Sequence, residues 1–174
     1  MHTQNPPILH RDLKPGNVKI TPEGKVFLVD FGLAKVAFTG QRTTTGARAM
    51  TPGYSPPEQY GGARTDHRSD IYSLAATLYA ALAGVVPEDS LARTMEQADL
   101  TPLRSRNADV SRRFSKIIEK ALAVHPDDRF QTADEFKQAL IETISASKRP
   151  LVEQGVVEPM LNTSLDDAFI DESI

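Results

Sequence analysis

Four polar residues in the first thirty positions could together do chemistry on a charged group. Asp12, Lys14 and Asn17 lie within six residues, and Asp30 follows thirteen residues after Asn17. A carboxylate can act as a general base, a lysine carries a mobile positive charge, and Asn and Asp oxygens suit hard cations such as Mg²⁺. Taken one at a time, Asp30 could equally cap a turn and Asn17 could bond local backbone. Their combined spacing therefore carries the argument.

The elements expected around these residues are short strands followed by helices. Val18–Ile20 and Val26–Val29 flank Thr21-Pro22-Glu23-Gly24, which predicts a hairpin. Residues 36–66 lack periodicity and predict a long functional loop. Apolar residues then recur at helical spacing from Ile71 to Leu82, with Ser69 or Asp70 as candidate caps and Gly84 as the stop. Two further helices are expected after Ser111 and Thr132.

The motif surrounding the polar residues is specific. His10-Arg11-Asp12-Leu13-Lys14-Pro15-Gly16-Asn17 precedes Asp30-Phe31-Gly32, and this order and spacing resembles the protein kinase family, in particular bacterial (Hanks-type) serine/threonine kinases. The resemblance implies a mainly α fold, the C-terminal lobe of a kinase built from a short β-hairpin and a helical bundle, with the N-terminal lobe absent. The implied domain covers residues 1–146, with a catalytic loop at 10–17, an activation segment at 30–58 and a helical subdomain at 66–146.

The resemblance also implies roles for the four polar residues. Asp12 would be the catalytic carboxylate that accepts the proton of the substrate hydroxyl, and Lys14 would neutralise the transferring phosphate. Asn17 and Asp30 would hold Mg²⁺. The expected cofactors are therefore ATP and Mg²⁺, with Lys14, Asn17 and Asp30 as the cofactor-binding residues.

Two further segments bear on substrate and regulation. Thr51-Pro52-Gly53-Tyr54 resembles the family's substrate-binding loop, and a threonine at position 51 together with Lys14-Pro15 implies protein substrates modified on Ser or Thr. In kinases with Arg before the catalytic Asp, that guanidinium receives a phosphate on the activation loop. Arg11 is therefore the expected receiver. The candidate acceptors are Thr43, Thr44 and Thr45, although a threonine-rich loop without a switch remains an equal alternative.

Several residues are expected to be structural. His10 would pack the catalytic loop and bond backbone, Gly32 closes the Asp-Phe-Gly motif, and Asp70 would bond backbone groups of the catalytic loop. Glu58 would form a buried ion pair with Arg129, and breaking such a pair typically costs ~3–5 kcal/mol.

Composition restricts the remaining classes of partner. The 174 residues are 40% hydrophobic and contain no cysteine, which excludes disulfides and thiolate chemistry. No apolar stretch is long enough for a membrane span and no signal pattern is present, so we expect a cytoplasmic protein. The net charge is −3, with −6 in residues 150–174. This distribution gives no reason to expect nucleic acid as a partner, and residues 147–174 are expected to be a disordered acidic tail.

The sequence has no Gly-rich loop and no Val-Ala-Ile-Lys strand before His10. Three hypotheses follow: a truncated serine/threonine kinase with coding sequence upstream, an inactive docking module that contacts another kinase lobe or a substrate, and a fragment without function. Loss of the small lobe should also expose apolar surface on the helix after Ser69. The first hypothesis is the prediction carried forward.

Overall fold

The computed structural model describes residues 1–31, 35–36, 50–61 and 64–147, with side chains omitted at 35–36 and 144–147. The strands are β1 (Ile8–Leu9), β2 (Val18–Ile20), β3 (Val26–Leu28) and β4 (Lys35–Val36). The longer helices are α2 (His67–Ala83), α5 (Arg112–Ala121) and α6 (Ala133–Ser147). Shorter helices are α1 (Pro57–Gly61), α3 (Ser90–Thr94), α4 (Leu103–Arg106), η1 (Pro15–Asn17) and η3 (Pro126–Asp128). The mainly α architecture with a short hairpin confirms the predicted fold class.

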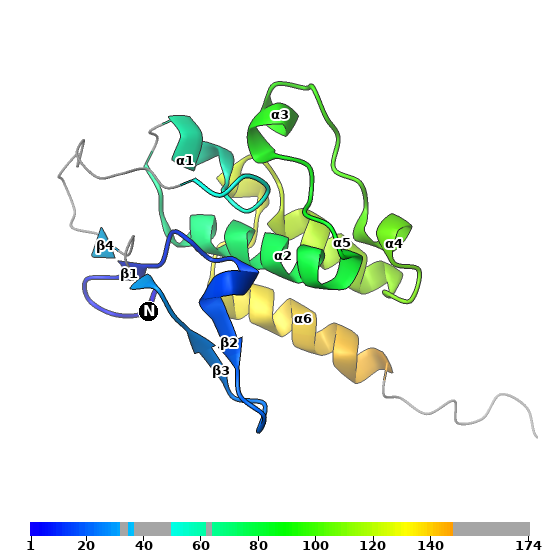
Figure 1. Ribbon diagram of the computed structural model, residues 1–174, viewed down its shortest axis with the longest axis horizontal. Coiled ribbons are helices and arrows are strands. Elements are labelled where there is room, and N and C mark those ends of the chain that lie inside the picture. The colour runs from blue at the N-terminus through cyan, green and yellow to red at the C-terminus, as the bar shows by residue number, and fades with distance from the viewer. Residues whose placement is uncertain (32–34, 37–49, 62–63, 148–174) are drawn as a thin grey trace, which may run out of the picture.

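The strands form two small antiparallel pairs beside the helices (Figure 1). β2 pairs with β3 in the register Val18 to Leu28, which confirms the predicted hairpin. Its turn closes through a bond from the Gly24 N–H to the Thr21 carbonyl, and Gly24 has a φ of 79° that favours glycine. β1 pairs with β4 at Ile8 and Val36, so the chain just before the polar motif lies next to the chain that follows Asp30.

Helix α2 crosses the centre of the helical part (Figure 1). It begins one turn earlier than predicted, because the Asp66 carboxylate accepts the Arg68 N–H and caps the helix. The proposed caps Ser69 and Asp70 instead lie in the first turn, where their side chains bind partners from distant segments. Gly84 ends the helix as predicted, with a φ of 73°.

Helices α5 and α6 complete the core with α2. Ser111 caps α5 by accepting the Phe114 N–H, and Thr132 accepts the Glu135 N–H at the start of α6, so both predicted starts are confirmed. Burial of α2 extends beyond the predicted stripe, since Tyr72 and Ala76 are fully buried. The core contains Ile71, Tyr72, Ala75, Ala76, Tyr79, Leu103, Val110, Ile118, Ala121, Leu122, Phe130 and Phe136.

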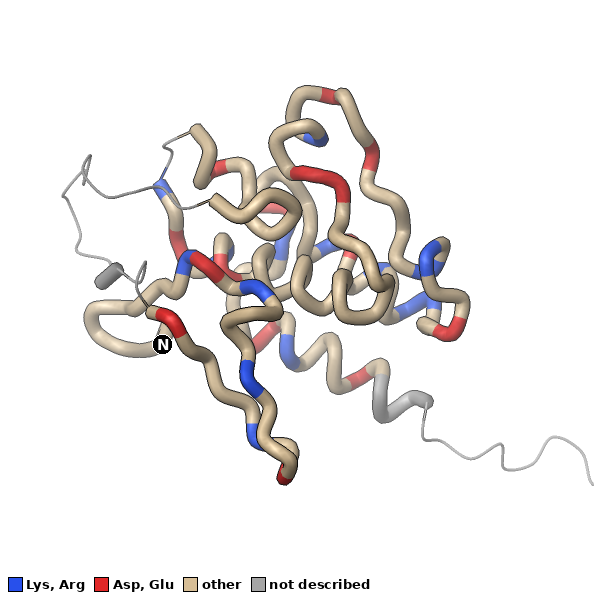
Figure 2. The backbone as a smooth tube through the Cα atoms, viewed as in Figure 1, with Lys and Arg blue, Asp and Glu red and all other residues tan. Residues whose placement is uncertain are grey.

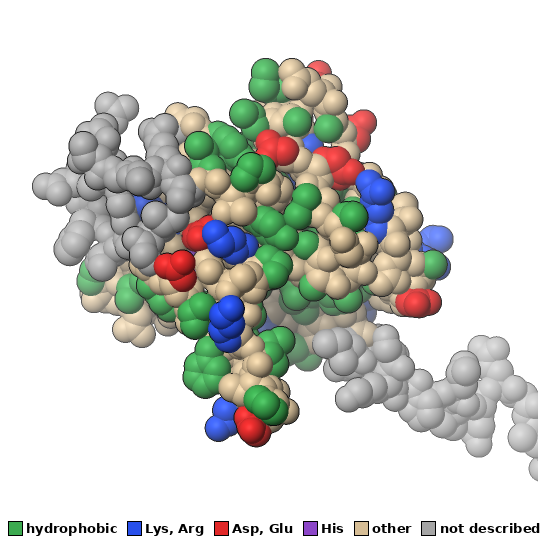
Figure 3. Space-filling view, in the orientation of Figure 1, with side chains coloured by type: hydrophobic (Ala, Val, Ile, Leu, Met, Phe, Trp, Pro, Cys, Tyr) green, Lys and Arg blue, Asp and Glu red, His purple; other side chains and the backbone are tan. Residues whose placement is uncertain are grey.

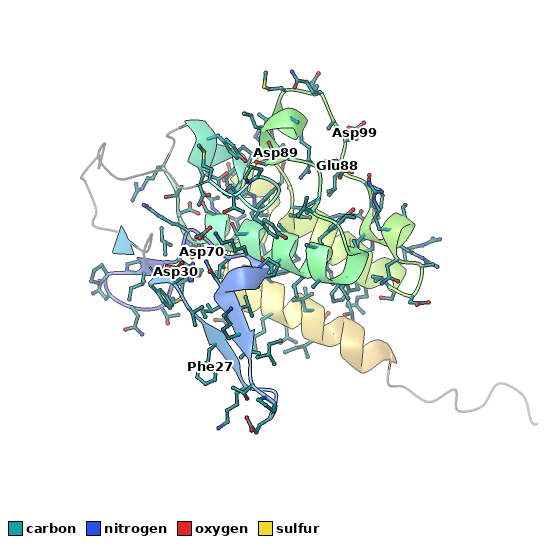
Figure 4. The ribbon with its side chains drawn as sticks, viewed as in Figure 1. Phe27, Asp30, Asp70, Glu88, Asp89 and Asp99 are labelled. Atoms are coloured by element: carbon teal, nitrogen blue, oxygen red, sulfur yellow. The ribbon has the colours of Figure 1, made fainter. Side chains whose placement is uncertain are left out.

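Apolar side chains are most exposed on the hairpin rather than along α2. Ile20, Val26 and Phe27 are 69%, 62% and 52% exposed, whereas Leu82 at the end of α2 is 38% exposed. Figure 3 shows apolar side chains on this hairpin, and Figure 4 places Phe27 on it. No helix in the described part of the chain combines the length and apolarity needed to cross a bilayer. The predicted acidic tail beyond Ser147 lies outside the described residues.

Candidate active site

The carboxylate of Asp12 receives polar contacts from three residues in two segments, its own loop and the loop that contains Thr51. Lys14 Nζ lies 2.8 Å from Oδ2, and Asn17 Nδ2 donates to the same oxygen at 3.0 Å. Thr51 Oγ1 donates to Oδ1 at 3.0 Å. The Asp12 side chain is 9% exposed, so these contacts hold a nearly buried carboxylate in one orientation. The structure thus brings together Asp12, Lys14, Asn17 and Thr51, as the sequence predicted.

Lys14 connects the Asp12 carboxylate to the loop that contains Thr51. Its Nζ also lies 3.4 Å from Thr51 Oγ1 and the side chain is one-third exposed. Pro15 opens η1 directly after Lys14, since its fixed φ favours the first turn of a helix and its missing N–H is not needed there. The Thr51 N–H in turn donates to Ser55 Oγ at 3.0 Å, which holds the threonine in place.

Asp70 at the start of α2 anchors the backbone on which Asp12 sits. Its carboxylate accepts the N–H of His10 at 2.9 Å and of Arg11 at 2.8 Å, and Asp70 is 2% exposed. Arg11 has a φ of 69°, a conformation that costs about 1 kcal/mol for a residue with a Cβ. Both backbone bonds therefore hold a bend that would otherwise relax, and the predicted contact of Asp70 with the catalytic loop is present (Figure 4).

The two predicted magnesium ligands come from adjacent segments. The Val29 N–H donates to the Asn17 carbonyl at 2.9 Å, and His10 Nε2 lies 3.1 Å from the Val29 carbonyl, so Asp30 follows directly on a residue fastened to this loop. This is the backbone contact predicted for His10. Asp30 has a φ of 61°, a strained conformation for a non-glycine residue. Among the described residues no three His, Cys, Asp or Glu side chains form a metal-binding group.

Of the predicted regulatory residues, the structure describes only Arg11. Burial lowers the pKa of the Arg11 guanidinium, and the neighbouring Asp70 carboxylate offsets only part of this effect. Arg11 Nε is buried without a hydrogen-bond partner in the part of the chain that the structure describes. Gly32, Thr43, Thr44 and Thr45 lie outside the described residues.

The predicted pair of Glu58 and Arg129 is present and buried. Arg129 Nη1 and Nη2 donate to the two Glu58 oxygens at 2.8 and 3.0 Å. Ser69 Oγ donates to the same carboxylate at 2.7 Å. This arrangement fastens the segment after Thr51 to the start of α2 and to the chain before α6.

A second set of hydrogen bonds that holds the Thr51 loop was not predicted. The Asp89 carboxylate accepts the Gly53 N–H at 3.3 Å and the Tyr60 hydroxyl at 2.8 Å. Ser90 Oγ donates to the Ser55 carbonyl at 2.7 Å. Figure 4 shows Asp89 beside this loop. An Asp-Ser pair is a common helix start, so the sequence contains no signal for the long-range contact.

Two further side-chain contacts near the His10–Asn17 motif were not predicted. His2 Nε2 lies 2.8 Å from Asp70 Oδ2, and Gln59 Nε2 donates to the Arg11 carbonyl at 3.0 Å. Gln59 follows Glu58 directly in the chain, so the peptide before Asp12 is linked to the region of the buried ion pair. Gln59 thus binds this backbone directly, whereas His2 contacts it only through the Asp70 carboxylate.

The sequence model of the protein kinase domain matches residues 1–141. The chain belongs to the protein kinase family. This kinase chain is 42% identical over 141 residues to serine/threonine-protein kinase PknB of Mycolicibacterium smegmatis, covering 77% of the chain and 23% of that protein. It is 38% identical over 138 residues to tyrosine-protein kinase MasK of Myxococcus xanthus, covering 76% of the chain and 21% of that protein.

Solved structures show the same similarity. The PknI kinase domain of Mycobacterium tuberculosis aligns with a TM-score of 0.55 and 33% identity, over 78% of this kinase chain and 46% of that domain. The apo form of PpkA-294 aligns with a TM-score of 0.62 and 31% identity, over 76% and 46% respectively. The kinase chain therefore spans less than a quarter of the length of the two relatives named above and about half of each solved kinase structure.

Proposed function

We propose that this chain carries the phosphoryl-transfer residues of a magnesium-dependent protein kinase that moves the γ-phosphoryl group of ATP to Ser or Thr hydroxyls of proteins. The observation that carries the proposal is the contact of the Asp12 carboxylate with both Lys14 and Thr51. A base, a cation and a substrate-loop hydroxyl meet at one point. Phosphoryl transfer requires mainly such positioning and charge neutralisation.

Asp12 is proposed to orient and deprotonate the attacking hydroxyl. Asn17 and Thr51 each donate to one of its oxygens, so the carboxylate cannot rotate freely. These two donors fix the direction in which the carboxylate oxygens face an attacking hydroxyl. A positioned general base of this kind contributes roughly 10²- to 10⁴-fold in rate.

Lys14 is proposed to neutralise negative charge on the transferring group. Its Nζ already lies 2.8 Å from Asp12, so a phosphoryl group approaching the base would meet the ammonium at the same time. The side chain is one-third exposed, so its ammonium can move toward an incoming phosphate and exchange part of its contact with Asp12 for one with the phosphate.

Asn17 and Asp30 are proposed to hold Mg²⁺ with ATP. The Asn17 amide nitrogen donates to the Asp12 carbonyl at 2.8 Å and to the Asp12 carboxylate, which directs the amide oxygen away from these acceptors. One amide oxygen and one carboxylate suit an ion that keeps phosphate oxygens and water as its other ligands. ATP would supply the transferable γ-phosphoryl group, and Mg²⁺ would neutralise part of the phosphate charge.

Thr51 is proposed to select the class of acceptor hydroxyl. It donates to Asp12 and accepts from Lys14, so the substrate loop is tied directly to the base. A relative named as a tyrosine kinase reaches 38% identity, so identity alone does not decide between the two acceptor classes. The contact of Thr51 with both Asp12 and Lys14 is what supports assignment to the Ser and Thr class.

Arg11 is proposed to receive a phosphate on Thr43, Thr44 or Thr45. A buried guanidinium nitrogen without a partner in the described residues supports this role, because a phosphate would satisfy it. The pair of Glu58 and Arg129, with Asp70, His10 and Gly32, is proposed to keep the loops in position rather than to touch reactants.

The test separates nucleotide binding from transfer. Mg²⁺-dependent ATP binding is measured by calorimetry for the wild-type chain and for Asp30→Asn, and phosphate incorporation into Ser-, Thr- and Tyr-containing peptides is measured for wild type and Asp12→Asn. The proposal expects weaker binding for Asp30→Asn and loss of transfer with retained binding for Asp12→Asn. Equal binding by wild type and Asp30→Asn would remove the metal assignment. Peptide binding without any nucleotide binding would contradict the kinase proposal and favour an inactive docking module.

A further inference from the structure

An open hollow between α4 and α5 is lined by basic side chains. Arg104 and Ser105 come from α4, and Arg112 and Lys116 come from the first two turns of α5. Figure 2 shows basic positions gathered over α4 and the start of α5, at the end of α2 away from β1 and β4. The proposed phosphoryl-transfer site uses none of these residues, so it does not account for the basic side chains in the hollow.

Two of the three cations have no counter-ion among the residues that the structure describes. Within the described part of the chain, Arg104 and Arg112 form no ion pair, whereas their neighbours Arg106 and Arg113 pair with Glu88 and Glu142. Residues 102–120 contain six basic and two acidic side chains, a net charge of +4. The positive charge of the hollow therefore exceeds what its surroundings neutralise.

One carboxylate does line the hollow. Glu119 accepts from Ser115 Oγ at 2.6 Å and lies 2.8 Å from Lys116 Nζ. Lys116 is 73% exposed, and an exposed pair at this helical spacing contributes little to stability. Lys116 can therefore share its charge with an incoming anion, while Ser115 keeps Glu119 in place.

The first turn of α5 carries positive charge where helices usually carry negative charge. Helices favour acidic residues in the first turn, because the N-terminal end carries partial positive charge. Helix α5 has no acidic residue there and begins with Arg112 and Arg113. The basic residues thus add to the positive end of the helix instead of neutralising it, which favours binding of an anionic group from elsewhere.

We propose that this basic hollow binds the acidic segment of the same chain, residues 153–172. That segment contains Glu153, Glu158, Asp166, Asp167, Asp171 and Glu172, and no basic residue follows Arg149. Its charge of −6 over residues 150–174 is opposite to the +4 of residues 102–120. The inference does not depend on the proposed kinase activity.

The connection between the two segments is short enough. Arg113 Nη2 lies 2.7 Å from Glu142, so the start of α5 is next to the last turns of α6. Helix α6 ends at Ser147, five residues beyond Glu142 and hence ~7 Å further along its axis. Nineteen residues lead from Ser147 to Asp166 and can span up to ~60 Å. A tether of this length gives a local concentration on the order of mM, enough for a weak charge contact to form.

Zero-length carbodiimide cross-linking of the full chain, read by peptide mass spectrometry, tests the contact. At ~0.01 M ionic strength, where charges interact over ~30 Å, Lys116 should form amide links to carboxylates of residues 153–172, and at ~1 M these links should disappear. Lys19 and Lys25, both exposed on the hairpin, are the reference lysines. The link between Lys116 and Glu119 is the internal check on reactivity.

Matched variants separate the hollow from general charge attraction. Arg104→Gln with Arg112→Gln leaves Lys116 in place and should lower the yield of tail links by up to roughly 5-fold for each guanidinium removed. Arg113→Gln removes an equal charge that already pairs with Glu142, and should change the yield little. Tail links to Lys19 and Lys25 as frequent as those to Lys116 would overturn the proposal. A yield that rises with protein concentration would overturn it too, since a second copy would then supply the tail.

Discussion

The guanidinium of Arg129 and the carboxylate of Glu58 meet in the interior of the helical part, 71 residues apart in sequence. Arg129 is fully buried and the Glu58 side chain is 8% exposed. The remaining donors of Arg129 bind the carbonyls of Ala123, Val124 and Arg68 at 2.8, 2.9 and 3.2 Å. The pair therefore joins the segment that follows the Thr51 loop to the helical core.

Replacing Arg129 by Met should lower the free energy of unfolding by ~3–5 kcal/mol, because the Glu58 charge would remain buried without its partner. Urea unfolding followed by circular dichroism measures this. Arg113→Ala is the matched control, since Arg113 and Glu142 form a pair that is about half exposed on both sides, and it should change stability by less than ~1 kcal/mol. Similar losses for both variants would contradict the role given to the buried pair.

Thr51 should affect catalysis through its hydroxyl rather than its methyl group. Thr51→Val keeps the shape but removes the donor to Asp12, and a charge-assisted hydrogen bond of ~1.5–3 kcal/mol corresponds to a roughly 10- to 100-fold loss of transfer rate. Thr51→Ser keeps the donor and should retain most of the rate. Phosphate incorporation at saturating ATP is the measurement. Equal rates for the Val and Ser variants would exclude this role.

The contacts around Asp12 were predictable because they depend on a motif with fixed spacing. Asp12, Lys14 and Asn17 lie on one short loop, and Thr51 follows from the family's substrate loop. The caps Ser111 and Thr132 were predictable for a local reason, since a hydroxyl before an apolar period satisfies the N–H groups two or three residues later.

The start of α2 was predicted one turn too late for a physical reason. Ser69 and Asp70 are good capping residues, but their side chains bind Glu58 and the His10 N–H, partners that lie far away in sequence. Asp66 is then left to cap the helix. The contact of Asp89 with Gly53 was missed for the same reason, because it depends on how two loops approach each other rather than on either loop's own pattern.

Gly53 should be the least replaceable of three glycines. It has a φ of 81°, and an added Cβ would lie 3.0 Å from the Val86 Cβ. Gly53→Ala should therefore cost ~1–2 kcal/mol for the left-handed backbone and ~1–3 kcal/mol more for overpacking. Gly24 also has a positive φ, but an added Cβ would meet no atom within 4 Å. Gly24→Ala should therefore show only the backbone cost of ~1–2 kcal/mol. Gly16→Ala meets no atom within 4 Å and should be neutral or slightly stabilising. Thermal unfolding of the three variants would contradict this account if Gly16→Ala were the most destabilised.

Asp89 should make the fold sensitive to acid. Burial disfavours its charge, but bonds from the Tyr60 hydroxyl and from the N–H groups of Gly53 and Leu91 outweigh this and hold the pKa of the Asp89 carboxyl below its ordinary value. A depressed pKa in the folded state means that the ionised group stabilises the fold above about pH 4, the usual range of an unfolded Asp, and that this contribution disappears as the pH falls through the folded-state value.

Asp89→Asn should consequently be less stable than wild type at pH 7, and the two curves of unfolding free energy against pH should converge as the pH falls below about 4. Asp99→Asn is the control, because Asp99 is exposed and makes no hydrogen bond or ion pair in the described part of the chain (Figure 4). Urea unfolding at a series of pH values measures both variants. A difference between wild type and Asp89→Asn that stays constant down to pH 3 would mean that the lost contacts are independent of the Asp89 charge.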